Sequence, residues 1–272
     1  MEGVPPFEHL CDRSEFRHPA HRTGVELYRA HIVRHAFEPH AHDGFGLGAI
    51  ETGVERFRYR GADHLAPPGA LVSMNPDELH TGRAVTDGGW RYRMLYIDCD
   101  VAQTVLGERA LWFDAPVHHD PQRARRAGEL VDALWQAREP LAFDGLLLQF
   151  LEAFRPHARQ RPLPVERAGR FAPVIDFLQA NLAQRVTLEE VAAVAGLSPF
   201  HFLRSFRAQY DVTPQQLLMA LRLDAAKRRL AAGDAPAVVA ADTGLADQAH
   251  LTRAFVRRYG VTPARYQRQL RA

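Results

Sequence analysis

The sequence predicts an α+β protein of two domains, a β-sandwich or small barrel followed by an all-α domain. Residues 25–97 alternate apolar and polar side chains with period two, and short Gly, Pro and Asn-Pro turn signals separate the runs. Helical spacing of apolar residues replaces this pattern over residues 121–157, and residues 171–270 have a helical pattern almost throughout. A chain of 272 residues is long enough for two domains that each bury a core.

The charge of the chain is unevenly distributed. The net charge is +2, but residues 1–169 carry −4 and hold 12 of the 14 histidines, while the remaining residues carry +6. This asymmetry favours an anionic partner for the second half and different chemistry in the first. The proline-containing segment 161–169 is predicted to link a first domain at 1–160 to a second at 170–272.

The sequence shows no feature of a secreted or membrane-bound protein. Residues 1–6 have neither a basic nor an apolar run of the secretory type, and the densest apolar stretch, residues 146–151, is too short to span a bilayer. Cys11 and Cys99 are isolated and are expected to be unpaired thiols in a reducing compartment. We therefore expect a cytoplasmic protein with no membrane partner.

The first domain combines strands with a helical segment. One strand is expected at Phe45–Ile50, and another at residues 90–96, where Trp90, Tyr92, Met94 and Tyr96 share one buried face. The helical segment at residues 121–157 presents an apolar stripe of Leu147, Leu151 and Phe154. This stripe either joins two copies of the chain or packs on the sheet of the same chain.

An internal repeat occupies the last hundred residues. Residues 201–214 recur 49 positions later as 250–263, both copies reading His-x-x-Arg-x-Phe and then Tyr-x-Val-Thr-Pro. Upstream, the Val-Ala-Ala…Gly-Leu pattern of 191–197 recurs 48 positions later as 239–245. Each copy has the layout of a helix-turn-helix, with a short helix, a turn containing Gly and a second helix.

The residues at the helix ends and along the helix faces agree with this layout. Thr187, Ser198 (before Pro199) and Asp247 are predicted to cap helices. Apolar residues four apart are expected to face inward, whereas the arginine between them points outward in each copy. The inward residues are Phe202 and Phe206, and Leu251 and Phe255; the outward ones are Arg204 and Arg253.

The outward faces of the second helices carry side chains that suit duplex DNA. An α-helix fits the major groove, where Arg pairs with guanine and Gln with adenine. The candidate contacts are Phe200, His201, Leu203, Arg204 and Arg207 in the first copy, and Gln248, Ala249, Thr252, Arg253 and Arg257 in the second. Arg207, Arg257 and Arg258 are expected to contact phosphates, which adds affinity without sequence information.

The second half resembles the AraC/XylS family of transcription factors. The resemblance covers residues 171–270 and rests on Gly-Leu-Ser-Pro at 196–199, the two His-x-x-Arg segments and Gly-Val-Thr-Pro at 260–263. It implies seven helices, with a long helix at about 214–230 holding two recognition helices roughly 34 Å apart. It also implies duplex DNA, a small-molecule effector, RNA polymerase and a second copy of the chain as partners. Leu203 and Leu245 depart from the residues common in the family.

The first half resembles the cupin-like sensor domain that often precedes such a DNA-binding domain. This resemblance rests on His40-Ala41-His42, followed by turn signals and by His80. The three histidines are expected to converge, because residues i and i+2 of a strand face the same way. Three imidazoles suit zinc, iron or nickel. Metal-binding cupins also have a Glu soon after the second His, where this chain has Gly46 and Leu47, and Glu51 falls later.

Three interpretations of these histidines remain open. They line a cavity for a small organic effector together with Trp90, Tyr92 or Tyr96, they bind a metal, or they are hydrogen-bonded core groups. We favour the organic effector and predict no cofactor.

Two further classes of protein are weighed against the regulator. One is a cupin-type dioxygenase or isomerase fused to a DNA-binding domain. The other is a DNA-repair protein, which would need a thiol activated by basic neighbours or a metal, and neither cysteine has such neighbours in the sequence. The sequence therefore predicts a regulator without catalytic activity.

Overall fold

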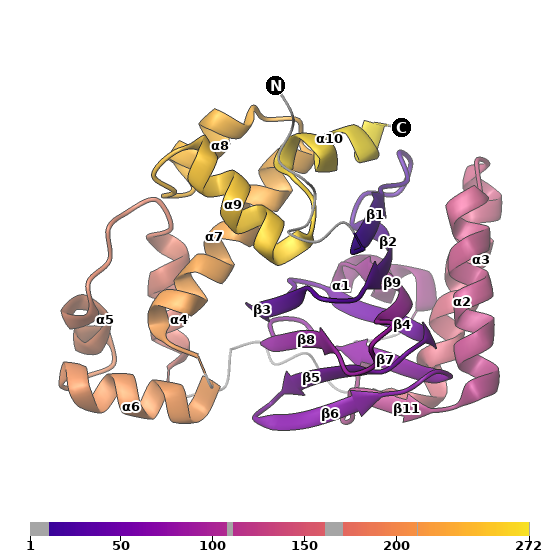
Figure 1. Cartoon of the computed structure of the whole chain (residues 1–272), viewed down its shortest axis with the longest axis horizontal. Helices are drawn as coiled ribbons and strands as arrows, with labels where there is room; N and C mark the ends of the chain where they lie inside the picture. Colours follow the sequence, from indigo (N-terminus) through magenta and orange to yellow (C-terminus); the bar gives the residue numbers. More distant parts are fainter. Residues whose placement is uncertain (1–10, 108–110, 161–170, 211, 272) are drawn as a thin grey trace.

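The computed structural model describes residues 11–107, 111–160, 171–210 and 212–271. Its first half contains two antiparallel sheets (Figure 1). The larger has the strand order β1-β2-β9-β4-β7-β11. Its strands are β1 (Arg13–Arg17), β2 (Val25–Ile32), β4 (Phe45–Thr52), β7 (Ala70–Met74), β9 (Trp90–Ile97) and β11 (Val117–His119).

The second sheet faces the inner side of the first, which confirms the predicted sandwich. Its order is β3-β8-β5-β6, with strands β3 (Ala36–His40), β5 (Glu55–Tyr59), β6 (Ala62–Ala66) and β8 (His80–Ala84). Phe57 and Tyr59 of this sheet pack with Tyr28 and Met94 of the larger one. A short pair, β10 (Leu111–Trp112) and β12 (Arg159–Gln160), joins distant parts of the domain.

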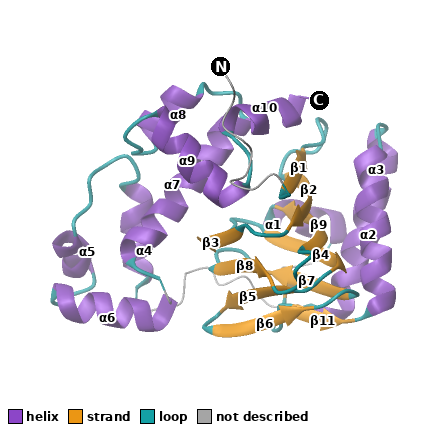
Figure 2. Ribbon diagram, viewed as in Figure 1, coloured by secondary structure: helices purple, strands orange, loops and turns teal. Residues whose placement is uncertain are grey.

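Helices cover the outer face of the larger sheet (Figure 2). They are α1 (Cys99–Leu106), α2 (Pro121–Gln136) and α3 (Pro140–Phe154), followed by the 3₁₀ turn η1 (Arg155–His157). Leu95 packs beneath them with Leu130 and Leu134. On β9, Trp90, Tyr92 and Met94 are buried on the predicted face, and Arg91 on the other face is exposed. Leu95 on that other face is also buried, because the helices cover it.

The apolar stripe of α3 belongs to the interior of the same chain. Leu147, Leu151 and Phe154 are fully buried in the core beneath α2. They are not accessible to a second copy, so of the two alternatives the structure supports packing within the same chain. Leu141 and Leu148, which are 87% and 40% exposed, lie on the outer side of α3 instead.

The described residues of the second half form seven helices. They are α4 (Ala172–Ala180), α5 (Leu188–Val194), α6 (Pro199–Tyr210), α7 (Pro214–Ala231), α8 (Pro236–Asp242), α9 (Gln248–Tyr259) and α10 (Pro263–Arg271). We call α5 with α6 the first unit and α8 with α9 the second unit. The predicted linker at 161–169 lies outside the described residues. None of the described helices is long and apolar enough to cross a membrane.

Local sequence accounts for the boundaries of these helices. Thr187 and Glu190 form a capping box at α5, and the Asp247 carboxylate accepts the His250 N–H at the start of α9, as predicted. Gly196 and Gly244 occupy the turns of the two units with φ of +65° and +71°, a left-handed conformation that favours glycine. The two copies of the repeat therefore fold alike.

The two halves of the chain share a hydrophobic core. Phe16 and Tyr28 of the sandwich belong to the same buried cluster as Phe255, Tyr259 and Tyr266 of α9 and α10. The first unit has a separate core, around Phe171, Phe202 and Phe206 with Leu217 of α7. The second unit therefore packs against the sandwich. The first unit lies at the other end of α7, around its own core (Figure 1).

Candidate functional site

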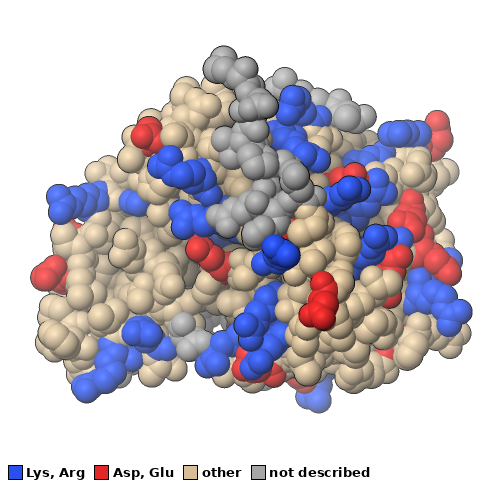
Figure 3. Space-filling view, in the orientation of Figure 1, with Lys and Arg blue, Asp and Glu red and all other residues tan. Residues whose placement is uncertain are grey.

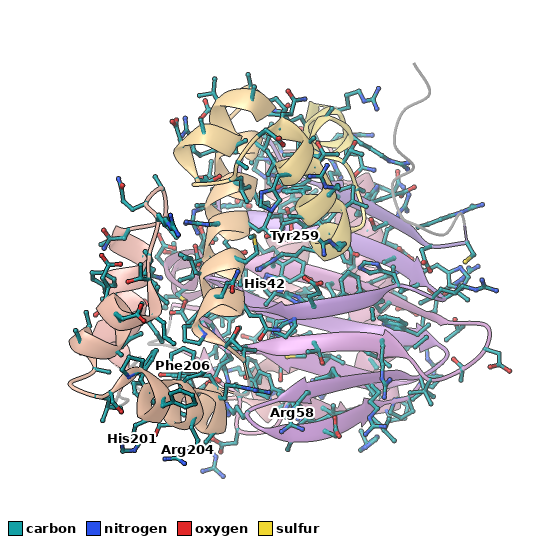
Figure 4. All side chains as sticks on the ribbon, turned by 60° about the vertical axis from the view of Figure 1, so that its left-hand side comes forward. His42, Arg58, His201, Arg204, Phe206 and Tyr259 are labelled. Atoms are coloured by element: carbon teal, nitrogen blue, oxygen red, sulfur yellow. The ribbon has the colours of Figure 1, made fainter. Side chains whose placement is uncertain are left out.

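The second helix of each unit exposes the residues predicted to contact DNA. On α6, Phe202 and Phe206 are fully buried, whereas His201, Arg204 and Arg207 are exposed. Figure 4 shows His201 and Arg204 pointing away from the domain. Phe200 is 91% exposed at the start of the helix. The remaining candidate, Leu203, is half-buried.

The helix α9 presents a similar face. Gln248, Ala249, Arg253 and Arg257 are exposed, while Thr252 is half-buried and donates a 2.9 Å hydrogen bond to the Gln248 carbonyl. Basic side chains lie over α6 and near α9, and others are spread over the rest of the same face (Figure 3). Such surfaces have the charge that phosphate backbones attract.

Arg258 does not belong to this surface, and the prediction that it contacts phosphate was wrong. It is 4% exposed, and its guanidinium donates to Asp224 of α7 at 2.6 Å and to the carbonyls of Ala220 and Ala41 at 3.1 Å. Ala41 follows β3, so this arginine joins α9 to the sandwich. Its neighbour Arg257 is exposed and lies 3.9 Å from the Glu38 carboxylate of β3.

A second cross-domain connection is a buried ion pair. The Lys227 ammonium of α7 lies 2.5 Å from a carboxylate oxygen of Glu26 on β2. The other oxygen lies 2.7 Å from His18 Nε2 and accepts a 3.1 Å bond from the Tyr266 hydroxyl. Burial alone would raise the pKa of Glu26, but the Lys227 charge and the bond from His18 outweigh it and lower that pKa to about 2. The pair is therefore charged at neutral pH.

The three predicted histidines converge on a cavity of about 50 Å³ at this junction. His40 and His80 are cross-strand partners on β3 and β8, with ring centroids 4.2 Å apart, and His42 lies 5.1 Å from each. Strand geometry does not explain this, because β3 ends at His40 and His42 lies beyond it. Tyr92 and Tyr96 also line the cavity, as do Lys227, Arg258 and Tyr259 from the second half.

One expected residue, Trp90, does not line the cavity, and the sequence interpretation missed another residue, Glu55, that does. Trp90 is fully buried behind Tyr92, on which it stacks at 5.5 Å. Glu51 is exposed and pairs with Arg93 on the outer side of the sheet. Glu55 of β5 faces the cavity, and burial raises the pKa of its carboxyl to about 8. In the sequence, only its position in the alternating pattern of β5 indicated that this side chain faces inward.

A larger hollow of about 630 Å³ lies between the sandwich and the first unit. Tyr59 and Trp112 line it from the sandwich, and Ile175, Leu217 and Leu221 line it from the helical half. Sites for small organic molecules usually occupy about 300–1,000 Å³. This hollow has that size, whereas the histidine cavity does not.

Cys99 lacks the features of a reactive thiol. Both cysteines are free, and burial raises the pKa of Cys99 to about 11, with nearby carboxylates acting in the same direction. An activated cysteine has a lowered pKa. The structure therefore gives no support to repair chemistry at Cys99.

Comparison with known proteins gives consistent matches over both halves. Residues 22–151 match the AraC-like ligand binding domain, and residues 191–269 match a helix-turn-helix domain. The HTH-type transcriptional regulator YbfI of Bacillus subtilis is 27% identical, over 84% of this chain and 86% of that protein. The MmsAB operon regulatory protein of Pseudomonas aeruginosa is 26% identical, over 92% of this chain and 79% of that protein.

The fold as a whole is similar to that of ToxT from Vibrio cholerae. A crystal structure of apo ToxT superposes with a TM-score of 0.59 at 11% identity, covering 92% of this chain and 98% of ToxT. Another ToxT structure contains a bound unsaturated fatty acid.

A sensor-like sandwich joined to a double helix-turn-helix domain defines a ligand-responsive DNA-binding protein. The chain belongs to the AraC-type transcriptional regulators, with an N-terminal ligand-binding domain and a C-terminal DNA-binding domain. This confirms the family and the fold class that the sequence predicted.

Proposed function

We propose that this regulator binds duplex DNA through the exposed faces of α6 and α9, and that its sensor domain controls the position of α9. The observation that carries the proposal is the shared cavity, whose wall comes from both domains. His40 and Tyr96 of the sandwich and Lys227, Arg258 and Tyr259 of the helical half line the same space. Any change in the occupancy of this cavity therefore acts directly on the helices that carry the second unit.

The proposed base contacts follow from exposure and side-chain chemistry. Arg204 and Arg253 are exposed at equivalent positions of the repeat and can each donate two hydrogen bonds to guanine. Gln248 suits adenine, and the exposed ring of Phe200 suits a thymine methyl group. The other proposed contacts at the major groove are His201, Leu203, Ala249 and Thr252.

Arg207 and Arg257 are the proposed phosphate contacts. In the structure, two carboxylates of the sensor domain lie next to arginines of the second half. Glu38 lies near Arg257, and Asp43 pairs with Arg228. When the protein binds DNA, a phosphate group would take the place of the Glu38 carboxylate next to Arg257.

The Arg257→Ala variant should weaken binding to every duplex and flatten its salt dependence. Loss of one phosphate contact lowers the slope of log K against log salt by about 0.9. Fluorescence anisotropy with specific and random duplexes over a range of salt concentrations measures this slope. Arg125→Ala, an exposed arginine on α2, serves as the control and should retain the parent slope. An unaltered slope for Arg257→Ala would remove Arg257 from the phosphate surface.

We further propose that the effector acts at the junction between the two domains. The fatty acid of ToxT is a precedent for an organic ligand in a protein of this fold. A molecule of that size fits the hollow of about 630 Å³ beside the first unit and not the histidine cavity. The small size of the histidine cavity also argues against catalysis on an organic substrate in that cavity.

RNA polymerase and a second copy of the chain are further proposed partners. The outer side of α3, where Leu141 and Leu148 are exposed, is the surface that we propose for a dimer, because the inner stripe is already covered.

A further inference from the structure

The histidine cavity has the donor arrangement of a metal site. One nitrogen from each of His40, His42 and His80 lies within 4.8 Å of the others. Three imidazoles around a zinc ion at about 2.0–2.1 Å would have nitrogens roughly 3.4 Å apart. The side chains therefore need to move together by about 1 Å, which rotation about their own bonds can supply. Figure 4 shows His42 between the sheet and Tyr259 of α9.

Hydrogen bonds orient two of the rings for this role. His40 Nδ1 lies 2.7 Å from the Glu38 carbonyl, and His80 Nδ1 lies 3.0 Å from the Glu78 carbonyl. A carbonyl can only accept, so each Nδ1 carries the proton and each Nε2 keeps its lone pair. Metal-binding histidines are commonly held in this way by a backbone carbonyl.

The third ring supplies an independent observation. The Nε2 atom of His42 is buried and has no hydrogen-bond partner among the described residues. A buried polar atom without a partner is costly, typically by about 1–3 kcal/mol. Coordination of an ion would satisfy this atom.

The surrounding charges permit a cation. Arg258 and Lys227 line the cavity, but Asp224 and Glu26 neutralise them. Each cation therefore has an acidic partner within 2.6 Å, so its charge is paired beside the histidines.

The size of the cavity favours an ion over an organic molecule. A water molecule occupies about 30 Å³ in the liquid. A space of about 50 Å³ accepts an ion with one or two waters, and it is several-fold smaller than a usual small-molecule site.

We propose that His40, His42 and His80 bind one divalent first-row transition metal ion of the zinc type through their Nε2 atoms. Water or an oxygen of a small ligand completes the coordination from the cavity side. Ala41, whose carbonyl accepts a bond from Arg258 of α9, lies between two of these ligands. Drawing His40 and His42 onto an ion shifts this carbonyl, so the metal alters the attachment of α9. This coupling rests on the proposed function, whereas the metal site itself does not.

The test is a titration of chelator-treated full-length protein with Co²⁺, followed by visible absorption, and with Zn²⁺ in competition. We expect one equivalent to bind, with a d–d spectrum of low coordination number. The His42→Ala variant should bind at least 100-fold more weakly, since it loses one of three ligands. His64→Ala is the matched control, a half-buried histidine of β6 that packs on Phe57 outside the cavity, and it should bind like the parent. His42→Gln repeats the test if the alanine variant does not fold.

The possible results separate the metal site from the proposed function. Absence of stoichiometric Co²⁺ and Zn²⁺ binding by the parent, or equal binding by a folded His42 variant, would overturn the metal site. DNA affinity is measured in the same samples with and without Zn²⁺, and a change that His42→Ala abolishes supports the coupling. Metal binding with unchanged DNA affinity overturns the coupling alone. Loss of all DNA binding in every sample counts against the proposed function and leaves the metal result valid.

Discussion

Replacing Arg204 or Arg253 with alanine should cost about 1–3 kcal/mol in binding to the specific DNA site, and the double variant should lose nearly all discrimination between sites. Each arginine is exposed at the equivalent position of its unit, and each can form a bidentate contact with guanine that no smaller side chain replaces. Both substitutions remove side chains outside the two cores, so folding stability should be unchanged.

The measurement is competitive binding with duplexes mutated one base pair at a time. Each single variant should become indifferent to base identity at one half of the site and remain selective at the other. Arg125→Ala should behave like the parent in the same assay, because it lies on α2, far along the chain from the recognition helices. Retention of full base preference by both Arg204→Ala and Arg253→Ala would contradict the assignment of α6 and α9.

The Glu26→Gln variant should weaken the closed arrangement of the two domains by about 3–5 kcal/mol. It leaves the Lys227 ammonium buried without a countercharge, which is the costly way to break a buried ion pair. The rings of Phe16, Tyr96, Tyr259 and Tyr266, which lie 5.0–5.7 Å from the ammonium, replace only part of that interaction. Urea unfolding should show a lower midpoint or separate transitions for the two domains.

The exposed pair between Arg228 and Asp43 gives the matched control. It also joins the two halves, but both side chains are more than half exposed, so Asp43→Asn should cost no more than about 1 kcal/mol. Equal effects of Glu26→Gln and Asp43→Asn would show that burial of the Glu26–Lys227 pair has no energetic importance.

The same ion pair predicts that the stability of the folded protein depends on pH in the acidic range. The pKa of Glu26 is lowered from its usual value of 4.5 to about 2 in the folded protein, so its contribution to stability is complete above about pH 4.5. It is lost progressively as the pH falls from 4.5 toward 2. The parent should therefore lose stability over this range more steeply than Glu26→Gln.

Much of the fold, and which faces of α6 and α9 are exposed, could be predicted from the sequence, because these features are local. The spacing of Phe202 with Phe206, and of Leu251 with Phe255, determines which side of each helix is buried, and hence that Arg204 and Arg253 are exposed. The same periodicity places residue 258 seven positions after Leu251, on the inward side. Arg258 was nevertheless assigned to DNA, because an arginine on a basic helix suggests phosphate more strongly than it suggests burial.

The junction between the domains could not be predicted in this way. Glu26 and Lys227 are 201 positions apart, and no local pattern relates them. Lys227 is the only lysine among the 34 Lys and Arg residues. This indicated that its position requires a compact ammonium group and not a guanidinium. The stripe of α3 illustrates the same limit, since periodicity identifies a buried face but not the surface that covers it.

The central claim is that one chain places α6 and α9 in successive major grooves. Hydroxyl-radical footprinting of the full-length protein, on a duplex selected from genomic fragments, tests it most directly. The account predicts two protected stretches about one helical turn apart on one face of the duplex, of which Arg253→Ala weakens one and Arg204→Ala the other. A single protected stretch at saturation, or a pattern that neither substitution changes, would contradict it.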